Sequence, residues 1–284
     1  MRKDVYYQRG AADPILEESL VLDIVRQHVP EAKRLRHIDE SGGEARVYAV
    51  DEGIILKVQR PQQLRMSTSL EKEALFLRQL EKQTNVSVPR VLGYGRYEAH
   101  EYICMTPIPG IAAEHAKLST SEKNALLLVL GKELRKIHSI DQQPLVESGL
   151  FPRDDPPDLL ERLLRRYQSA IQRRDDVSPD KKELALSKVE QATHMIQDMD
   201  VFVALHVNPY IPHVFVDENT HKYSGIIDFG DSYIGHPIFD MWYWKVASRK
   251  ILLQGYMSDS PVSAAFQSIF DVLNTISHTV EELR

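Results

Sequence analysis

The stretch SGIIDFGDSYIGHPIFD, residues 224–240, is the segment from which the fold can be worked out. It places the carboxylate of Asp228 between an apolar, strand-like segment and a flexible glycine. A carboxylate in that position can hold a hard cation, which prefers oxygen ligands. An aspartate at a strand end can equally begin a plain turn. The motif therefore gains its meaning from the segments that precede it.

A polar loop comes before this stretch. The segment LHVNPYIPHV, residues 205–214, carries His206, Asn208 and His213 between two strand-like pieces. Its two prolines predict a rigid loop, because the proline ring fixes the backbone φ angle. We expect the three polar side chains to face a common cleft. The alternative for each histidine is a hydrogen-bonded structural role.

The first third of the chain has the pattern of strands with one inserted helix. Residues 46–50 and 54–58 are rich in apolar and β-branched residues and are joined by a short turn with a glycine, which predicts a β-hairpin. Apolar positions recur with helical spacing over residues 69–82. Residues 89–95 and 102–105 predict two further short strands.

Helices precede and follow this part. Asp13-Pro14 predicts the start of a leading helix, since an oxygen cap is followed by proline at the first helical position. Longer helices are predicted at residues 119–140, 159–173 and 181–199.

The proline and glycine residues at 107–110 mark the best boundary between two parts of different composition. The sequence therefore predicts an α+β fold with two lobes. A small, β-rich N-terminal lobe would comprise residues 1–106, and a larger, mainly α-helical C-terminal lobe would comprise residues 107–284.

The first lobe holds a candidate buried ion pair and a candidate phosphate-binding turn. Lys57 lies within the apolar segment 54–58, where an ammonium must find a partner or reach water. Glu73, on the next predicted helix, is well placed to be that partner, although a surface glutamate is the alternative. The adjacent Gly42 and Gly43 would let the backbone approach a phosphate, or they mark a plain turn.

The composition limits the class of protein. The 284 residues include 43% hydrophobic and 27% charged residues, as in globular proteins, and the net charge of −6 argues against a nucleic-acid partner. The single cysteine, Cys104, cannot form an intramolecular disulfide or a Cys-rich zinc site. Because no apolar run approaches the ~20 residues of a membrane span and no signal-like apolar core begins the chain, we expect a cytoplasmic protein with no membrane partner.

Taken in their order along the chain, these motifs resemble the protein-kinase-like fold, and most closely the aminoglycoside and macrolide phosphotransferase family of antibiotic kinases. Residues 224–240 are very similar to the family's stretch around its metal-binding aspartate. The segments LRKIH, residues 134–138, and MTPIPG, residues 105–110, resemble its helix ending in Leu-His and its interlobe hinge. The resemblance covers about residues 35–245 and implies a two-lobed kinase-like fold.

The resemblance implies a nucleotide site in which ATP or GTP is the phosphoryl donor. Gly42 and Gly43 would cover the nucleotide phosphates. Lys57 would contact the α- and β-phosphates, and Glu73 would orient Lys57. The base pocket would be lined by Met105, Thr106 and Ile108.

The catalytic loop and the metal site follow from the same resemblance. Asp228 would bind Mg²⁺, and His206 would brace the loop. Two positions depart from the family's usual His-Gly-Asp-x-x-x-x-Asn. His213 stands where the second metal ligand is normally asparagine, and the macrolide branch is similar in using histidine there. Asn208 stands at the place of the catalytic aspartate, and a carboxamide cannot take a proton from a hydroxyl near neutral pH.

The implied function is transfer of the γ-phosphoryl group to a hydroxyl of an antibiotic-like small molecule, impaired by Asn208. The alternative is a catalytically inactive kinase-like protein that binds nucleotide or a metabolite. Aromatic residues including Trp242 and Trp244 either line a substrate pocket or pack in the core. The sequence does not identify the substrate or the oligomeric state.

Overall fold

The structure is a computed structural model, and it describes residues 15–39, 44–60, 69–98, 100–153, 156–194, 201–242 and 244–283, leaving out the side chains of residues 156–160 and 163. The chain forms two compact units, each discontinuous in sequence. Unit 1 comprises Met1–Lys117, Gln143–Leu150 and Ile211–Ser232, and unit 2 comprises Leu118–Gln142, Phe151–Tyr210 and Tyr233–Arg284. The two lobes 1–106 and 107–284 stay a prediction, and Asp13-Pro14 lies outside the described residues.

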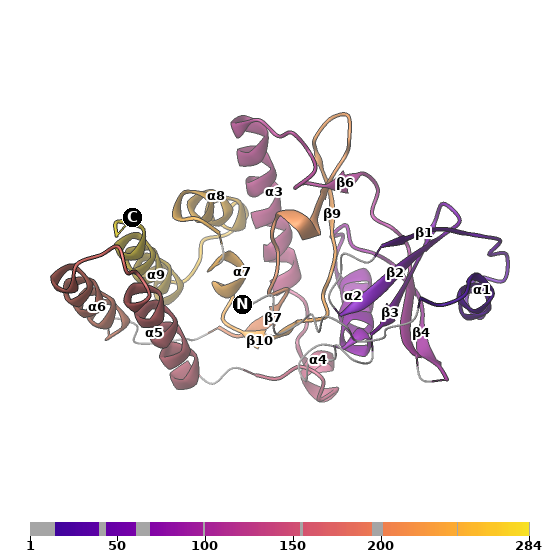
Figure 1. The fold of residues 1–284 in the computed structure, drawn as a ribbon, viewed down its shortest axis with the longest axis horizontal. Coiled ribbons are helices and arrows are strands. Elements are labelled where there is room, and N and C mark those ends of the chain that lie inside the picture. The colour runs from indigo at the N-terminus through magenta and orange to yellow at the C-terminus, as the bar shows by residue number, and fades with distance from the viewer. Residues whose placement is uncertain are drawn as a thin grey trace. The chain divides into compact units, whose positions relative to one another are not determined.

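Unit 1 contains a five-stranded antiparallel sheet in the order β1-β2-β3-β5-β4 (Figure 1). Its strands are β1 (Leu35–Asp39), β2 (Ala45–Val50), β3 (Ile54–Gln59), β4 (Val91–Tyr97) and β5 (His100–Met105). Strands β2 and β3 form the predicted hairpin, and the predicted helix follows as α2 (Leu70–Gln83). Strand β1 is an addition that the sequence pattern did not predict.

The two faces of this sheet differ in what they bury. Tyr48, Leu56 and Tyr102 lie on one face in a core cluster with apolar residues of helix α1 (Glu18–Arg26). Because side chains alternate along a strand, Lys57 on β3 points to the opposite face. Its cross-strand partner there on β5 is Ile103, which is fully buried. The sheet thus aims one ammonium away from its main core.

A three-stranded antiparallel sheet in the order β6-β8-β9 completes unit 1. Its elements are β6 (Ile111–Ala112), the 3-10 turn η3 (Ile211–His213), β8 (Val214–Val216) and β9 (Tyr223–Ile226), and helix α4 (Gln143–Glu147) belongs to the same unit. Gly110 precedes β6 at φ 94°, and a Cβ atom there would lie 2.0 Å from the carbonyl oxygen of Val216. Only glycine fits that approach.

Unit 2 is mainly helical. Its helices are α3 (Thr120–His138), α5 (Pro156–Gln172), α6 (Pro179–His194), α7 (Phe239–Trp242), α8 (Val246–Tyr256) and α9 (Ala264–Glu281). Strands β7 (Val203–Leu205) and β10 (Tyr233–Gly235) form an antiparallel pair. Helix α3 begins at a capping box between Ser119 and Glu122, and with α5 and α6 it confirms the three predicted helices. The predicted last helix continued to residue 199, but residues 195–200 lie outside the described part.

Helices α3 and α8 pack at backbone distance. A Cβ atom on Gly131 would lie 2.1 Å from the carbonyl oxygen of Leu252, and one on Gly255 would lie 2.0 Å from that of Leu128. The sheet of unit 1 and the helices of unit 2 confirm the α+β class. In the described ranges, the structure has no helix with the length and apolar character needed to cross a membrane.

Candidate functional site

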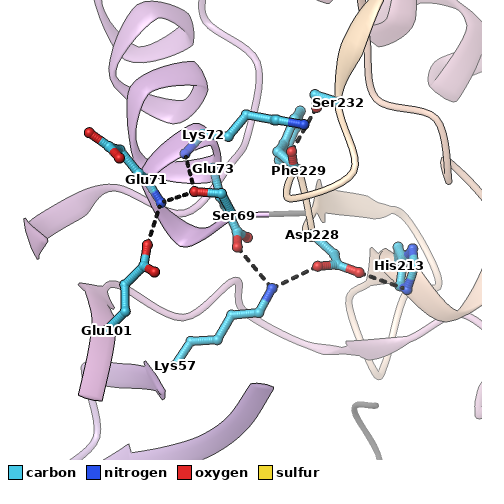
Figure 2. A network of polar contacts seen from close by, with 10 residues as sticks. All are labelled: Lys57, Ser69, Glu71, Lys72, Glu73, Glu101, His213, Asp228, Phe229 and Ser232. Carbon is cyan, nitrogen blue, oxygen red and sulfur yellow. Dashed lines mark hydrogen bonds and ion pairs between the residues drawn. The ribbon is translucent and has the colours of Figure 1, made fainter. Parts of the chain in front are cut away.

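Three charged side chains of unit 1 converge on one point (Figure 2). The ammonium of Lys57 donates hydrogen bonds to Glu73 Oε2 at 2.9 Å and to Asp228 Oδ1 at 2.7 Å. The side chain of Glu73 is 1% exposed and that of Lys57 is 16% exposed, whereas Asp228 is 38% exposed. The cluster therefore has a buried end at Glu73 and a partly open end at Asp228.

Regular elements hold the buried end in place. Lys57 lies in the middle of β3, between paired strands on both sides. Glu73 lies in the first turn of α2, which begins at Ser69, whose hydroxyl oxygen accepts hydrogen bonds from the backbone N–H groups of Glu71 and Lys72. This cap fixes the start of the helix and so the position of the glutamate relative to the strand.

The charges in the cluster control one another's ionisation. Burial alone would lower the pKa of Lys57, but the charges and hydrogen bonds of Asp228 and Glu73 raise it above its ordinary value. Burial raises the pKa of Glu73, and the ammonium of Lys57 and the backbone N–H of Phe229 act against that rise. Lys57 thus stays a cation at physiological pH, held by two acidic side chains.

Asp228 stands at a turn with unusual backbone geometry. Its φ angle is 74°, in the left-handed region that is uncommon for residues other than glycine. The next residue, Phe229, is fully buried, packs edge-on against Phe76 at 5.2 Å and accepts a hydrogen bond from the Ser232 hydroxyl to its carbonyl oxygen. This anchoring supports the left-handed conformation, which turns Asp228 toward Lys57.

His213 is also held at this turn. Its Nε2 atom lies 3.4 Å from Asp228 Oδ2, and its carbonyl oxygen accepts a hydrogen bond from the N–H of Ile227 at 3.0 Å. The structure thus brings together four of the residues singled out from the sequence: Lys57, Glu73, His213 and Asp228.

A divalent cation fits this arrangement in part. Asp228 offers a partly exposed carboxylate with His213 beside it, but the described residues contain no group of three or more His, Cys, Asp or Glu side chains that could hold a metal. Mg²⁺ usually binds through one or two carboxylates and takes its other ligands from water and substrate phosphates. The residues present therefore suit a cation that arrives with a phosphate group.

The predicted base-pocket residues lie at the end of β5 in unit 1. Met105 and Ile108 are buried, and Thr106 exchanges two hydrogen bonds with Arg90: its N–H donates to the arginine carbonyl oxygen and its hydroxyl oxygen accepts from the arginine N–H. The side chain of Ile108 lies where a Cβ atom on Gly225 would be, within 2.7 Å. The predicted phosphate-binding glycines, Gly42 and Gly43, lie outside the described residues.

His206 and Asn208 belong to unit 2, where an unpredicted residue, Asp240, holds their loop. The Asp240 carboxylate is 1% exposed and accepts hydrogen bonds from the backbone N–H groups of His206 at 2.8 Å and Val207 at 2.6 Å. It also bonds His138 Nε2 at 2.8 Å, and His138 Nδ1 lies 3.0 Å from the Tyr256 hydroxyl. Burial raises the pKa of Tyr256 to about 12, so the phenol keeps its proton.

These contacts assign the protons along the chain of side chains. A carboxylate accepts hydrogen bonds, so His138 donates from Nε2 to Asp240. The Nδ1 atom of neutral His138 then accepts from the phenol of Tyr256. One buried carboxylate thus receives three hydrogen bonds, two of them from consecutive backbone N–H groups of the loop.

Val207 lies between His206 and Asn208 at a φ angle of 78°. A β-branched residue in the left-handed region is strained, by roughly 1–3 kcal/mol. In the family's pattern His-Gly-Asp this position is a glycine, so valine is a third departure that the sequence analysis missed. The two hydrogen bonds to Asp240 hold the loop in the geometry that the valine opposes.

Asn208 is 8% exposed and takes part in a local network. Its Oδ1 atom accepts a hydrogen bond from the Tyr210 hydroxyl at 3.0 Å, and its backbone N–H donates to His206 Nδ1 at 3.3 Å. Neutral His206 therefore carries its proton on Nε2. Trp244 braces the same loop with an indole N–H that donates to the Pro209 carbonyl oxygen, and Trp242 packs against Tyr167.

Comparison with known proteins gives one family and a set of similar structures. The model of a family described as phosphotransferase enzyme family matches residues 35–250. No curated protein matches the sequence. Each structure compared is less than 25% identical to the chain, so the likeness concerns the fold.

Three similar structures show the range of relatives. The structure of the GDP complex of aminoglycoside 2'-phosphotransferase-IIIa has a TM-score of 0.66 at 16% identity, covering 95% of this chain and 93% of that one. Macrolide 2'-phosphotransferase from Brachybacterium faecium has a TM-score of 0.63 at 18% identity, covering 93% and 88%. Spectinomycin phosphotransferase in complex with ADP and spectinomycin has a TM-score of 0.62 at 13% identity, covering 95% and 87%. The kinase-like fold that the motifs predicted is thus confirmed.

Proposed function

Because this chain belongs to the phosphotransferase enzyme family, we propose that it is a small-molecule kinase, which moves the γ-phosphoryl group of ATP or GTP to a hydroxyl of an antibiotic-like molecule of the aminoglycoside or macrolide class. ATP and GTP are cytoplasmic donors, and the proposal places the reaction in that compartment. The observation that carries it is the contact of Lys57 with both Glu73 and Asp228. In protein kinases a strand lysine paired with a helix glutamate is required for activity.

The residues of unit 1 have separate parts in the proposal. Lys57, oriented by Glu73, binds phosphate oxygens of the donor. Met105, Thr106 and Ile108 line the pocket for its base, and Gly42 and Gly43 cover its phosphates. Asp228 and His213 hold Mg²⁺, which neutralises charge on the donor phosphates when bound.

In the transfer, the acceptor oxygen forms a bond to the γ-phosphorus, the bond from that phosphorus to the β-γ bridging oxygen breaks, and the nucleoside diphosphate leaves. The acceptor hydroxyl also loses its proton. Asn208 stands where the family has an aspartate, and its amide oxygen can orient the hydroxyl without taking the proton. His206 braces this loop. A positioned general base contributes about 10²–10⁴-fold, so the proposal predicts slow turnover at the expense of that factor.

A second candidate function rests on Asn208 itself. Its amide oxygen already accepts a hydrogen bond from Tyr210, which suits a loop that holds its shape without catalysis. The chain would then be an inactive kinase-like protein that binds nucleotide or a metabolite. Turnover separates the two: transfer of labelled phosphate from ATP or GTP to a panel of macrolides and aminoglycosides supports the kinase, and binding without transfer supports the second candidate.

The test of the nucleotide site is calorimetry with ATP and with GTP in the presence of Mg²⁺. Lys57→Met should weaken binding at least tenfold, because it removes the cation that meets the phosphates. The control, Lys132→Met, removes an exposed lysine of α3 and should bind as the original protein does. Equal affinity of Lys57→Met and the original protein would contradict the nucleotide site.

The test of the loop is Asn208→Asp. If the kinase proposal is right, restoring a carboxylate should raise kcat by about 10²-fold or more, with little change in nucleotide affinity. An unchanged kcat with a bound nucleotide would show that position 208 is not the place of the base.

A further inference from the structure

Unit 2 contains a cavity of about 290 Å³ that the proposed function does not use. It lies where the C-terminal ends of α3 and α8, strand β7 and the start of α9 meet, and all the residues that line it belong to unit 2. The inference drawn from it does not rest on the proposed function.

The wall of the cavity is mainly apolar. Val203 and Phe266 are buried and face it, Val262 is half-buried, and Val201 at its side is 38% exposed. Exposed apolar surface of this kind is covered at a gain of about 25 cal/mol per Å² when an apolar body enters. The ligand should therefore carry an apolar body.

One cation lies among these apolar residues. The guanidinium of Arg135 stacks over the Tyr256 ring at 4.9 Å and donates a hydrogen bond to the Ser260 hydroxyl at 2.8 Å. These two contacts fix the plane of a group that has five N–H donors, more than this bond uses. A planar guanidinium that is held in place suits a carboxylate, which it binds through two parallel hydrogen bonds.

The surroundings add to this preference for an anion. None of the residues that line the cavity is an aspartate or a glutamate. Helix α9, 18 residues long, begins at the cavity after Ser263 and has no acidic residue in its first turn, so the positive end of its dipole is not neutralised there.

The volume limits the size of the ligand. At ~30 Å³ for each non-hydrogen atom, a cavity of about 290 Å³ holds about ten such atoms. We propose that it binds a small monocarboxylate with an aromatic or branched apolar body, the carboxylate on Arg135 and the body against Val203, Val262 and Phe266.

The position of this site gives it a route to the loop at residues 206–208. His138 and Tyr256 form part of its wall, and they are the two side chains that lead to Asp240. A ligand that orders this wall favours the arrangement in which Asp240 holds the backbone N–H groups of the loop.

The test uses the full chain, labelled with ¹³C at the valine methyl groups, and titration with phenylacetate, which has ten non-hydrogen atoms of about the required number. Phenylacetate should bind with a Kd of about 1 mM or tighter, and the signals of the lining valines should move while that of Val58 in unit 1 stays. The uncharged analogue 2-phenylethanol should bind at least tenfold more weakly, because it lacks the charge that Arg135 recognises.

Two variants complete the test. Arg135→Gln should reduce the affinity for phenylacetate at least tenfold and leave that for 2-phenylethanol unchanged, whereas Arg165→Gln on the exposed face of α5 should alter neither. Equal affinity for the two ligands, no binding at 10 times the expected ~1 mM, or full affinity in Arg135→Gln would each overturn the proposal. If Arg135→Gln fails to fold, the comparison of the two ligands on the original protein decides.

Discussion

Replacing Asp240 with asparagine should release the loop that carries His206 and Asn208. The carboxylate accepts three hydrogen bonds, at 2.6 Å from Val207 N–H and at 2.8 Å from both His206 N–H and His138 Nε2. An asparagine keeps one acceptor oxygen and turns the other into a donor. In either orientation of the amide, at least one N–H of the chain then faces another donor.

The size of the effect follows from these bonds. A hydrogen bond to a charged group contributes about 1.5–3 kcal/mol and a neutral one about 0.5–1.5 kcal/mol. Losing one charged bond and making the others neutral costs about 3 kcal/mol or more, even after the easier burial of a neutral amide. Since 1.4 kcal/mol is a factor of ten, opening of the loop should become about 10²-fold more frequent.

Hydrogen exchange followed by mass spectrometry measures this directly. The peptide that contains the N–H groups of residues 206 and 207 should exchange about 10²-fold faster in Asp240→Asn, because those groups lose their buried acceptor. The control, Asp271→Asn, changes an exposed aspartate of α9 and should leave that peptide unchanged. If the variant is folded and its peptide exchanges within threefold of the original rate, on the scale of ~10² expected here, the carboxylate does not hold the loop.

Three further predictions test other parts of the molecule. Cys104 is fully buried and burial raises the pKa of its thiol to about 12, so at pH 8 it should not react with a thiol reagent until the protein unfolds; fast reaction of folded protein would contradict this burial. In Lys57→Met the buried Glu73 loses its cation and its folded pKa stays above the unfolded value of about 4.3, so stability should fall between pH 5 and pH 8 relative to Lys132→Met, and parallel pH profiles of the two melting temperatures would count against the ion pair. Gly131→Ala should cost about 1–3 kcal/mol because its Cβ meets the α8 backbone, while Gly53→Ala, with no atom within 4 Å, should not lower the melting temperature; equal melting temperatures would refute the close helix contact.

Local patterns were enough to predict the elements around the ion pair. The hairpin of β2 and β3 and helix α2 have clear periods, and a lysine within an apolar strand requires a partner, which pointed to Glu73. Strands β6 and β10 have two and three residues, too few for any period to be recognised. They form because their neighbours supply the pairing, which lies far away in the sequence.

The support of the loop in unit 2 was beyond sequence reasoning for the same reason. His138 is 102 positions from Asp240 and 118 positions from Tyr256, and none of the three stands out by residue type in its own segment. Both His138 and Asp240 do lie in segments that resemble the family, which was the available signal. The left-handed geometry of Val207 was likewise indicated by the glycine of the family's pattern.

The partners of Lys57 have a consequence for synthesis on the ribosome. The chain leaves unit 1 and returns to it, and Asp228 follows Lys57 by 171 positions. At about 5–20 residues per second, translation needs roughly 10–30 s to supply that second carboxylate after the lysine has been made. Until then the nascent sheet and α2 have only Glu73 to neutralise the ammonium, so this half of the protein cannot complete its structure before most of the other half has emerged.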